Sequence, residues 1–338
     1  MHRKLLPVLF FLLTVTWAKA QQQDSKTLQA TAQNFVKQGD YANAVLVLNR
    51  ARQQDPENTD VIKDLAYAQY LQEDYNKAEE TIKPLLDNRS ADVQTFQVAG
   101  LIYKAKDNEG EAEKVYRKAL KKFPSSGILY NEYGNMLLDL KNNNAIRIWE
   151  KGIEVDPNYA GNYYNAAQYY STAGDKIWSL LYAEIFVNME SYSKRTIDVK
   201  NLLLDTYRKL FTDIDLTKNA DGKGEFVTAY LNTLNKQSAL ASLGVTPESL
   251  TMIRTRFVLT WDKTYASRFP YRLFEYHRQL LREGLFDAYN QWLFGPVQNL
   301  TAYQNWTSTH ADTYKEFTDF QRGRVFKLPT GQSYQSKQ

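Results

Sequence analysis

The stretches Gly39-Asp40-Tyr41-Ala42-Asn43-Ala44 and Glu73-Asp74-Tyr75-Asn76-Lys77-Ala78 decide the fold of this chain, because they repeat one pattern at a spacing of 34 residues. The alanine that closes each stretch recurs further along the sequence. Ala112 follows Ala78 by 34 residues, and Ala145 follows after a further 33. A period of this length is typical of a repeat protein, in which each unit is a pair of helices that stacks on the next pair.

Prolines recur through the array with the spacing of the repeat. Pro56, Pro124 and Pro157 stand at equivalent places, and Ser90 occupies the place where another proline is expected. Proline has no amide N–H and biases the residue before it away from the helical conformation. Each of these prolines therefore predicts the end of the second helix of its unit.

Small residues recur where two helices of a unit must approach each other closely. They are Ala66, Gly100, Gly134 and Ala167 on the expected first helices, and Ala44, Ala78, Ala112 and Ala145 on the second. The period and this residue set resemble those of the tetratricopeptide repeat family from about Ser25 to Ser191. The resemblance implies an all-α fold with about five hairpins over residues 21–191, wound as a right-handed superhelix, or αα solenoid.

We expect the rest of the chain to remain helical. The fifth unit is degenerate and runs from Ala160 to Met189, and a helix within 192–212 is expected to cover the last open face of the array. The polar segment 213–224 is the expected linker, 225–328 the expected C-terminal α-helical domain, and 329–338 a flexible tail. Within the C-terminal domain, apolar stripes predict helices over 225–236, 270–294 with a break at Gly284, and 296–320. Thr246 and Pro247 are the expected N-cap and first turn of a further helix that leads into 250–261.

The first twenty residues have the three regions of a secretory signal peptide. Positive residues precede an apolar run from Leu5 to Trp17, and Ala18-Lys19-Ala20 offers small residues to a signal peptidase. The run of about 13 apolar residues is shorter than the roughly 20 that a membrane-spanning helix needs. We therefore expect cleavage after Ala20, a periplasmic or secreted location, and no stable membrane insertion. The phrase from Ala288 to Gly295, with the tail that ends at Pro329, is similar to uncharacterised exported repeat proteins of the Bacteroidota.

Composition excludes several classes of function. The formal net charge of the 338-residue chain is +4, but removal of Arg3, Lys4 and Lys19 leaves 39 basic against 38 acidic residues. A nearly neutral surface offers no basic field to a nucleic-acid backbone, so no nucleic-acid partner is expected. The chain contains no cysteine, so it has neither a disulfide nor the cysteine of a bacterial lipid anchor.

Few residues of the chain suggest a catalytic or metal-binding site. After removal of the signal, only His277 and His310 remain among the histidines, and they do not form the spacing of a zinc site. His277 lies in a segment rich in aromatic residues, which favours a packed histidine over a catalytic base. No phosphate-binding loop and no nucleophile elbow occurs. We therefore expect a protein that is not an enzyme and that has no metal and no cofactor.

The resemblance implies a concave groove lined by defined positions of each first helix. Counted from the first residue of each helix, the expected groove residues are Gln29, Gln33, Lys63, Tyr67, Tyr70, Gln94, Gln97, Asn131, Asn135, Tyr164 and Gln168. Amide side chains can pair with the backbone of an extended peptide or with sugar hydroxyls, and tyrosines can stack on side chains or rings. Some members of this family bind the C-terminal carboxylate of a peptide in the groove, and they need Lys, Arg and Asn at defined positions for this. In this chain Gln29 and Gln33 occupy the first two of those positions.

Three hypotheses about function follow from this pattern. The first is an exported, non-catalytic scaffold or adaptor that binds another protein or an extended peptide in its groove. The second is a component that binds or takes up glycans, which the aromatic and amide content suggests. The third is an enzyme with an unrecognised site in residues 225–328. The sequence identifies neither the partner nor the oligomeric state.

Overall fold

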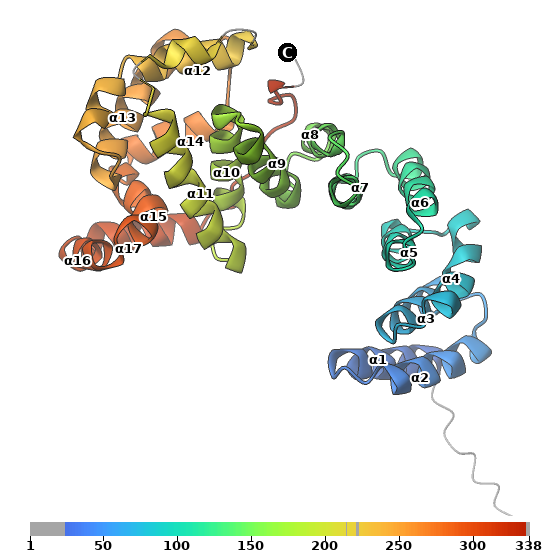
Figure 1. The fold of residues 1–338 in the computed structure, drawn as a ribbon. Coiled ribbons are helices and arrows are strands. Elements are labelled where there is room, and N and C mark those ends of the chain that lie inside the picture. Colours follow the sequence, from blue (N-terminus) through green and yellow to red (C-terminus); the bar gives the residue numbers. More distant parts are fainter. Residues whose placement is uncertain (1–23, 214, 221–222, 336–338) are drawn as a thin grey trace, which may run out of the picture. The chain divides into compact units, whose positions relative to one another are not determined.

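The computed structural model describes residues 24–213, 215–220 and 223–335, so the predicted signal peptide lies outside the described residues. Within the described part the chain forms seventeen α-helices and no strand, which confirms the predicted all-α fold (Figure 1). The helices cluster into two compact units, one up to Asp107 and one from Asn108 onward.

The first unit consists of helical hairpins with the predicted 34-residue period. Its elements are α1 (Ser25–Lys37), α2 (Tyr41–Gln54), α3 (Thr59–Leu71), α4 (Tyr75–Ile82), the short 3-10 helix η1 (Lys83–Asp87) and α5 (Val93–Ala105). Helix α2 ends two residues before Pro56, as predicted, whereas α4 gives way to the 3-10 turn that contains Pro84. The predicted small residues Ala44, Ala66 and Ala78 are fully buried.

A left-handed residue joins the two helices of each hairpin, and in most hairpins a capping residue follows it directly. The left-handed residues recur with the period of the array: Gly39, Glu73, Asp107, Lys141 and Gly174. In four of the five hairpins the next residue is the N-cap of the second helix, for example Asp40, whose carboxylate accepts a hydrogen bond from the Asn43 amide at 3.2 Å. The repeated pattern at residues 39–44 thus codes for a tight turn and a helix start.

The second unit continues the hairpins and then adds further helices. Its elements are α6 (Glu109–Lys122), α7 (Gly127–Asp139), α8 (Ala145–Val155), α9 (Ala160–Ala173), α10 (Lys176–Met189), α11 (Lys194–Leu210), η2 (Leu216–Ala220), α12 (Glu225–Asn235), η3 (Ser238–Leu243), α13 (Pro247–Thr264), α14 (Arg272–Arg282), α15 (Phe286–Gln298), α16 (Leu300–Thr309) and α17 (Ala311–Arg322). Pro124 and Pro157 each follow the end of a second helix by two residues, as predicted.

The fourth hairpin is one residue short, and its second helix absorbs the deletion. Helix α8 begins four residues after Lys141, whereas the other second helices begin two residues after the left-handed residue. The helix has therefore lost its first turn. Ala145 and Trp149 are nevertheless fully buried, so the contact face of the helix is unchanged.

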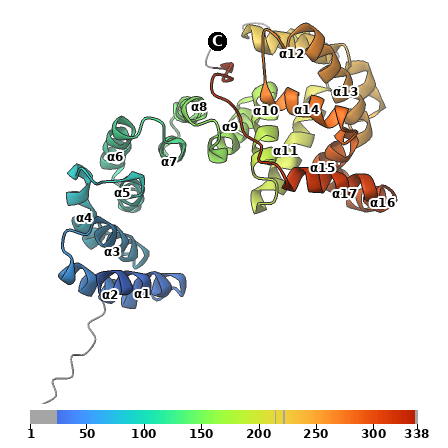
Figure 2. The ribbon, with the colours of Figure 1, turned by 180° about the vertical axis from the view of Figure 1, so that it is seen from behind.

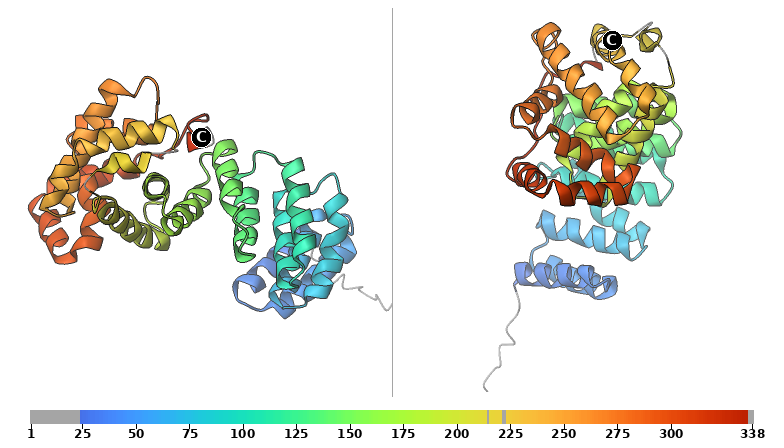
Figure 3. Two further views of the ribbon diagram at one scale, coloured as in Figure 1. Left: turned by 45° about the horizontal axis from the view of Figure 1, so that its top comes forward. Right: turned by 90° about the vertical axis from the view of Figure 1, so that its left-hand side faces the viewer.

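Helix α10 forms the centre of the second unit. Every residue from Ile177 to Asn188 is buried, which is the pattern of a helix covered on all sides. Helix α11, which corresponds to the predicted capping helix, packs against α10 and also against α15. Figure 3 shows α12 to α17 grouped around α10 and α11. The stack of helices therefore continues past α11 instead of ending there.

The C-terminal helices match the predicted stripes except at the last one. Helix α13 starts at Pro247 with Thr246 as its N-cap, and Gly284 adopts a positive φ of 72° between α14 and α15. The single helix predicted over 296–320 is instead the end of α15 followed by α16 and α17. Asn299 ends α15 with an extended backbone, and its side chain caps α16 by accepting the Ala302 amide hydrogen at 2.9 Å.

The expected flexible tail is held by side-chain contacts over residues 329–335. After α17 the chain runs back past α9 and α10 (Figure 2). Asn158 holds Leu328 by two hydrogen bonds, and the Tyr334 ring stacks on Phe226 with centroids 4.5 Å apart. The Tyr334 hydroxyl donates to the carbonyl of Pro270 at 2.7 Å. Aromatic burial thus orders a segment whose polar composition suggested flexibility.

None of the described helices combines the length and the apolar character that a bilayer span requires.

Candidate functional site

The predicted groove residues of the first unit fall into two groups, one of which links the helices to each other. Both Gln29 and Gln33 on α1 donate from Nε2 to the same carboxylate oxygen of Asp64 on α3, at 2.8 and 3.0 Å. Lys63 is buried, and its Nζ lies 2.9 Å from Asp60 and 2.7 Å from Asp92, the N-cap of α5.

The pKa values of Lys63 and Asp92 are consistent with a stable ion pair between them. Burial acts to lower the pKa of Lys63, but the carboxylates of Asp92 and Asp60 outweigh it and raise the pKa above its ordinary value. Burial likewise opposes the ionised form of Asp92, yet Lys63 and the Thr95 amide lower its pKa. Lys63 and Asp92 therefore both stay charged. Their ion pair holds α3 against α5, and Lys63 is not a free cation that could bind a ligand.

The other group of the first unit presents side chains to solvent. The rings of Tyr67 and Tyr70 on α3 are stacked with centroids 6.1 Å apart, and 37% of Tyr67 is exposed. Leu101 stands 34 residues after Tyr67, at the same repeat position of α5, and is also 37% exposed. Helices α3 and α5 pack side by side, and Gln94 is exposed at the start of α5. We call Tyr67, Tyr70, Gln94 and Leu101 the exposed repeat patch.

Leu101 was missed by the sequence prediction, although the period contained the necessary signal. The prediction selected amides and tyrosines, and it omitted an aliphatic residue at the position equivalent to Tyr67. Gln97 is half-buried on the same helix. Leu101 and Tyr67 thus expose side chains at the same repeat position of two helices that pack on each other.

In the second unit the predicted residues mainly contact other side chains of the same unit. Asn165 donates to Asn135 at 2.6 Å, and Asn135 faces the carbonyl oxygen of the Asn131 side chain at 3.5 Å. Asn131 itself is buried. The Tyr164 ring lies against Phe186 and under the Arg195 guanidinium, and Gln168 is half-buried. These residues stabilise α7, α9 and their neighbours more than they line an open surface.

A buried charged cluster joins four helices of the second unit. Glu184 on α10 forms an ion pair with Arg254 on α13 and accepts a hydrogen bond from the Tyr289 hydroxyl at 2.7 Å. Nε2 of His277 lies 2.7 Å from the same carboxylate oxygen. His277 is 3% exposed, which confirms the expectation of a packed histidine.

The pKa values within this cluster follow from burial and pairing. Burial acts to raise the pKa of Glu184, but Arg254, His277 and Tyr289 lower it to about 2. Burial lowers the pKa of His277 despite the nearby carboxylate. The adjoining cavity has a volume of only about 10 Å³, too small for a substrate. The cluster is therefore a structural cross-link between helices.

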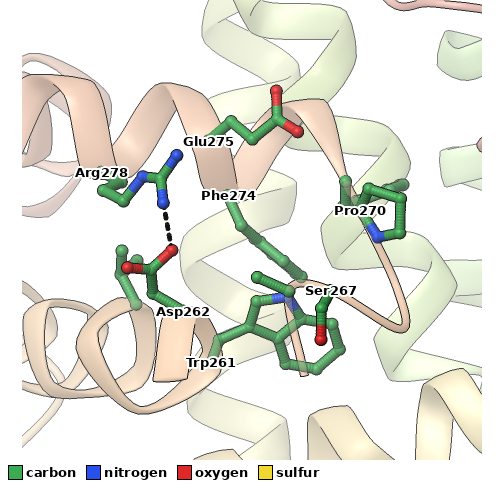
Figure 4. A pocket seen from close by; sticks show the side chains of 10 residues that line it. Trp261, Asp262, Ser267, Pro270, Phe274, Glu275 and Arg278 are labelled. Atoms are coloured by element: carbon green, nitrogen blue, oxygen red, sulfur yellow. Dashed lines mark hydrogen bonds and ion pairs between the residues drawn. The ribbon is translucent and has the colours of Figure 1, made fainter. Parts of the chain in front are cut away.

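A cavity of about 400 Å³ lies between the end of α13 and the start of α14. Figure 4 shows Asp262 and Arg278 facing each other as an ion pair, with Phe274 and Trp261 beside them. Asp262, Ser267 and Glu275 are among the polar residues that line this cavity, and no histidine or cysteine is among its lining residues. In the part of the chain that the structure describes, no three His, Cys, Asp or Glu residues gather as metal ligands.

Comparison with known proteins connects this geometry to a family. Residues 35–97 match the sequence profile of the tetratricopeptide repeat family. The fold is similar to a tetratricopeptide repeat protein of Thermus thermophilus, at 16% identity and a TM-score of 0.43 over 54% of this chain and 99% of that one. It is also similar to one from Parabacteroides merdae, at 16% identity and a TM-score of 0.43 over 74% and 96% of the two chains.

A third similar structure is the Cut9–Hcn1 hetero-tetramer of the APC/C, at 14% identity and a TM-score of 0.38 over 88% of this chain and 57% of that one. No curated protein matches the sequence. Tetratricopeptide repeats are generally non-catalytic scaffolds for contacts between proteins. The matching profile over residues 35–97, the 34-residue period and the hairpins are those of the tetratricopeptide repeat superfamily.

Proposed function

We propose that this protein is an exported, non-catalytic adaptor that binds an extended segment of another protein on the first helices of its N-terminal hairpins. The observation that carries the proposal is the exposed repeat patch. Tyr67 and Leu101 expose large apolar side chains at the same position of two adjacent helices. A row of matching positions on stacked hairpins suits an extended chain, whose side chains also recur at regular intervals.

The polar surroundings of the patch suit a peptide backbone. Gln94 is exposed on α5, and its amide can both donate to and accept from a peptide group. The neighbouring charges of Lys63, Asp60 and Asp92 are paired with one another, so the surface beside the patch lacks a strong net charge. We therefore expect the bound segment to contribute apolar or aromatic side chains to the patch.

Export is part of the proposal and rests on the sequence of the first twenty residues. Mass spectrometry of the protein from the periplasmic fraction tests it, with Gln21 expected as the first residue. Recovery of periplasmic protein with Met1 intact would contradict cleavage.

Partner binding is tested with the full mature chain and one pair of matched variants. Immobilised protein captures its partner from envelope extract, mass spectrometry identifies it, and calorimetry measures the affinity of the purified pair. Leu101→Asp is expected to weaken binding at least tenfold, since a charge in the centre of an apolar contact costs more than about 1.4 kcal/mol. Leu46→Asp on α2 is the control, because Leu46 is 50% exposed but lies on a second helix.

The result that contradicts the proposal is equal behaviour of the two variants. If both bind like the unmodified protein, the partner contacts another surface. If both lose binding together with the helical circular dichroism signal, the effect is a loss of folding. Binding of oligosaccharides to the patch on a glycan array, with loss in Leu101→Asp, would favour the glycan hypothesis instead.

A further inference from the structure

A second cavity of the C-terminal helices has the composition of an anion-binding site. It has a volume of about 310 Å³ and lies where the ends of α10 and α17 meet α14 and the chain after α17. Such a volume falls at the lower end of the range for small-molecule sites. Three arginines line the cavity, Arg272, Arg322 and Arg324, and no aspartate or glutamate is among its lining residues.

Acidic neighbours neutralise these arginines only weakly. The nearest carboxylate oxygen to Arg272 is that of Glu275 at 3.9 Å, and Glu283 lies 4.0 Å from Arg324. Among the described residues no carboxylate comes within ion-pair distance of Arg322. The cavity therefore keeps an excess of positive charge, which an anion would balance.

Aromatic rings hold two of the guanidinium groups in place. The Arg272 guanidinium lies over the Phe326 ring at 5.8 Å, and that of Arg324 lies over Phe320 at 4.3 Å. Tyr276 packs edge-on against Phe326 with centroids 5.3 Å apart. Stacked guanidinium groups lose little conformational freedom when they bind a ligand, and the rings offer an apolar wall.

An amide group inside the cavity points to the same kind of ligand. The Gln321 side chain accepts a hydrogen bond from the Tyr192 hydroxyl at 2.8 Å through its oxygen. Its Nε2 is inaccessible to solvent and has no acceptor among the described residues. A buried donor without a partner is costly, so an acceptor supplied by a ligand would stabilise this arrangement.

We propose that this cavity binds a small organic anion, with its carboxylate or phosphate group held by Arg322, Arg272 and the Gln321 amide. The apolar part of the ligand lies against Tyr276 and Phe326. The site is separate from the exposed repeat patch, so the C-terminal helices carry a ligand of their own. This inference stands or falls independently of the proposed partner binding.

Titration calorimetry of the full mature chain tests the proposal with four probes. Phenylacetate and phenyl phosphate carry a ring and an anionic group, inorganic phosphate carries only the anion, and phenylacetamide carries only the ring. We expect both ring-bearing anions to bind, phenylacetamide not to bind, and added salt to weaken the binding. Binding of inorganic phosphate alone would overturn the proposal of an organic ligand, and so would a lack of binding by both ring-bearing anions.

Two variants assign the binding to this cavity, and a third is the matched control. Gln321→Glu keeps the size of the side chain and the acceptor for Tyr192 but replaces the donor by a carboxylate. Arg322→Ala removes an exposed cation. Each is expected to weaken binding at least about tenfold, the scale of a charge-assisted hydrogen bond. Arg256→Ala removes an exposed arginine from α13, which does not line the cavity, and should bind like the unmodified protein. Equal affinities in all three variants would refute the assignment.

Discussion

Replacement of Gly134 by alanine tests whether the small residues of the array are required by close helix approach. Gly134 lies on α7, where it faces Trp149 of α8. A Cβ atom placed at Gly134 would lie 2.3 Å from the indole nitrogen of Trp149 and 2.6 Å from its Cδ1. Both distances are far below van der Waals contact, and Trp149 is fully buried, so the ring has no free space to enter.

The expected loss of stability is the balance of three effects. Alanine in a helix is favoured over glycine by about 0.5–1 kcal/mol. Overpacking of a buried site costs about 1–3 kcal/mol. Movement of Trp149 also breaks the hydrogen bond from its Nε1 to the carbonyl of Asn131, now 3.2 Å long, and an unpaired buried donor costs about 1–3 kcal/mol. We therefore expect Gly134→Ala to lower the free energy of unfolding by about 2–4 kcal/mol.

Urea and thermal unfolding, followed by circular dichroism, measure this change. For a unit of this size, 2–4 kcal/mol corresponds to a fall in Tm of about 4–16 °C. Gly110→Ala is the matched control, because Gly110 lies in helix α6 of the same unit and a Cβ there meets no atom within 4 Å. It should be neutral or slightly stabilising. If Gly134→Ala is as stable as Gly110→Ala, close approach of α7 and α8 is not the reason for glycine at this position.

Further predictions concern buried groups of the second unit. Glu184→Gln leaves Arg254 buried without its counter-charge and should cost about 3–5 kcal/mol in urea unfolding. The pKa of Glu184 is about 2 in the folded protein, against an ordinary value of 4.5. The stability that the carboxylate contributes is therefore present above pH 4.5 and is lost as the pH falls toward 2. The Glu184→Gln variant should not show this loss. Burial raises the pKa of Glu150 to about 7, so the unmodified protein should lose stability as the pH rises from 4.5 through 7. Above pH 7 the Glu150→Gln variant should be more stable than the unmodified protein by about 1–3 kcal/mol. Tyr334→Ala removes the ring stacked on Phe226 and should cost about 3 kcal/mol in thermal unfolding, whereas an unchanged Tm would mean that the C-terminal segment does not contribute to the fold.

The period of the sequence predicted the hairpins because backbone geometry and side-chain size repeat together. A left-handed turn residue, a capping carboxylate and a buried alanine each have a local physical cause, as at Gly39, Asp40 and Ala44. The separation of α16 from α17 at His310 could not be predicted in this way. The polar face of that segment continues through the break, and no glycine or proline marks it.

The candidate sites were less predictable, because their features depend on contacts between distant residues. Position in the repeat selected Tyr67, which is exposed, but it also selected Gln29 and Lys63, whose side chains pair with Asp64 and Asp92. Spacing along one helix does not reveal a carboxylate on the next. The arginine-lined cavity depends on residues from 188 to 326, and no local pattern connects them.

The shortened fourth turn shows how an array of duplicated segments can change in length during evolution. A deletion inside a helix would rotate all later side chains by about 100° and expose the residues that bind the neighbouring helix. A deletion beside the left-handed residue shortens only the start of α8, and Trp149 keeps its buried place. Copies of one ancestral hairpin can therefore gain or lose residues at this point of the unit while they retain their mutual fit. Gene comparisons should find length differences among relatives concentrated at the positions that correspond to residues 141–145.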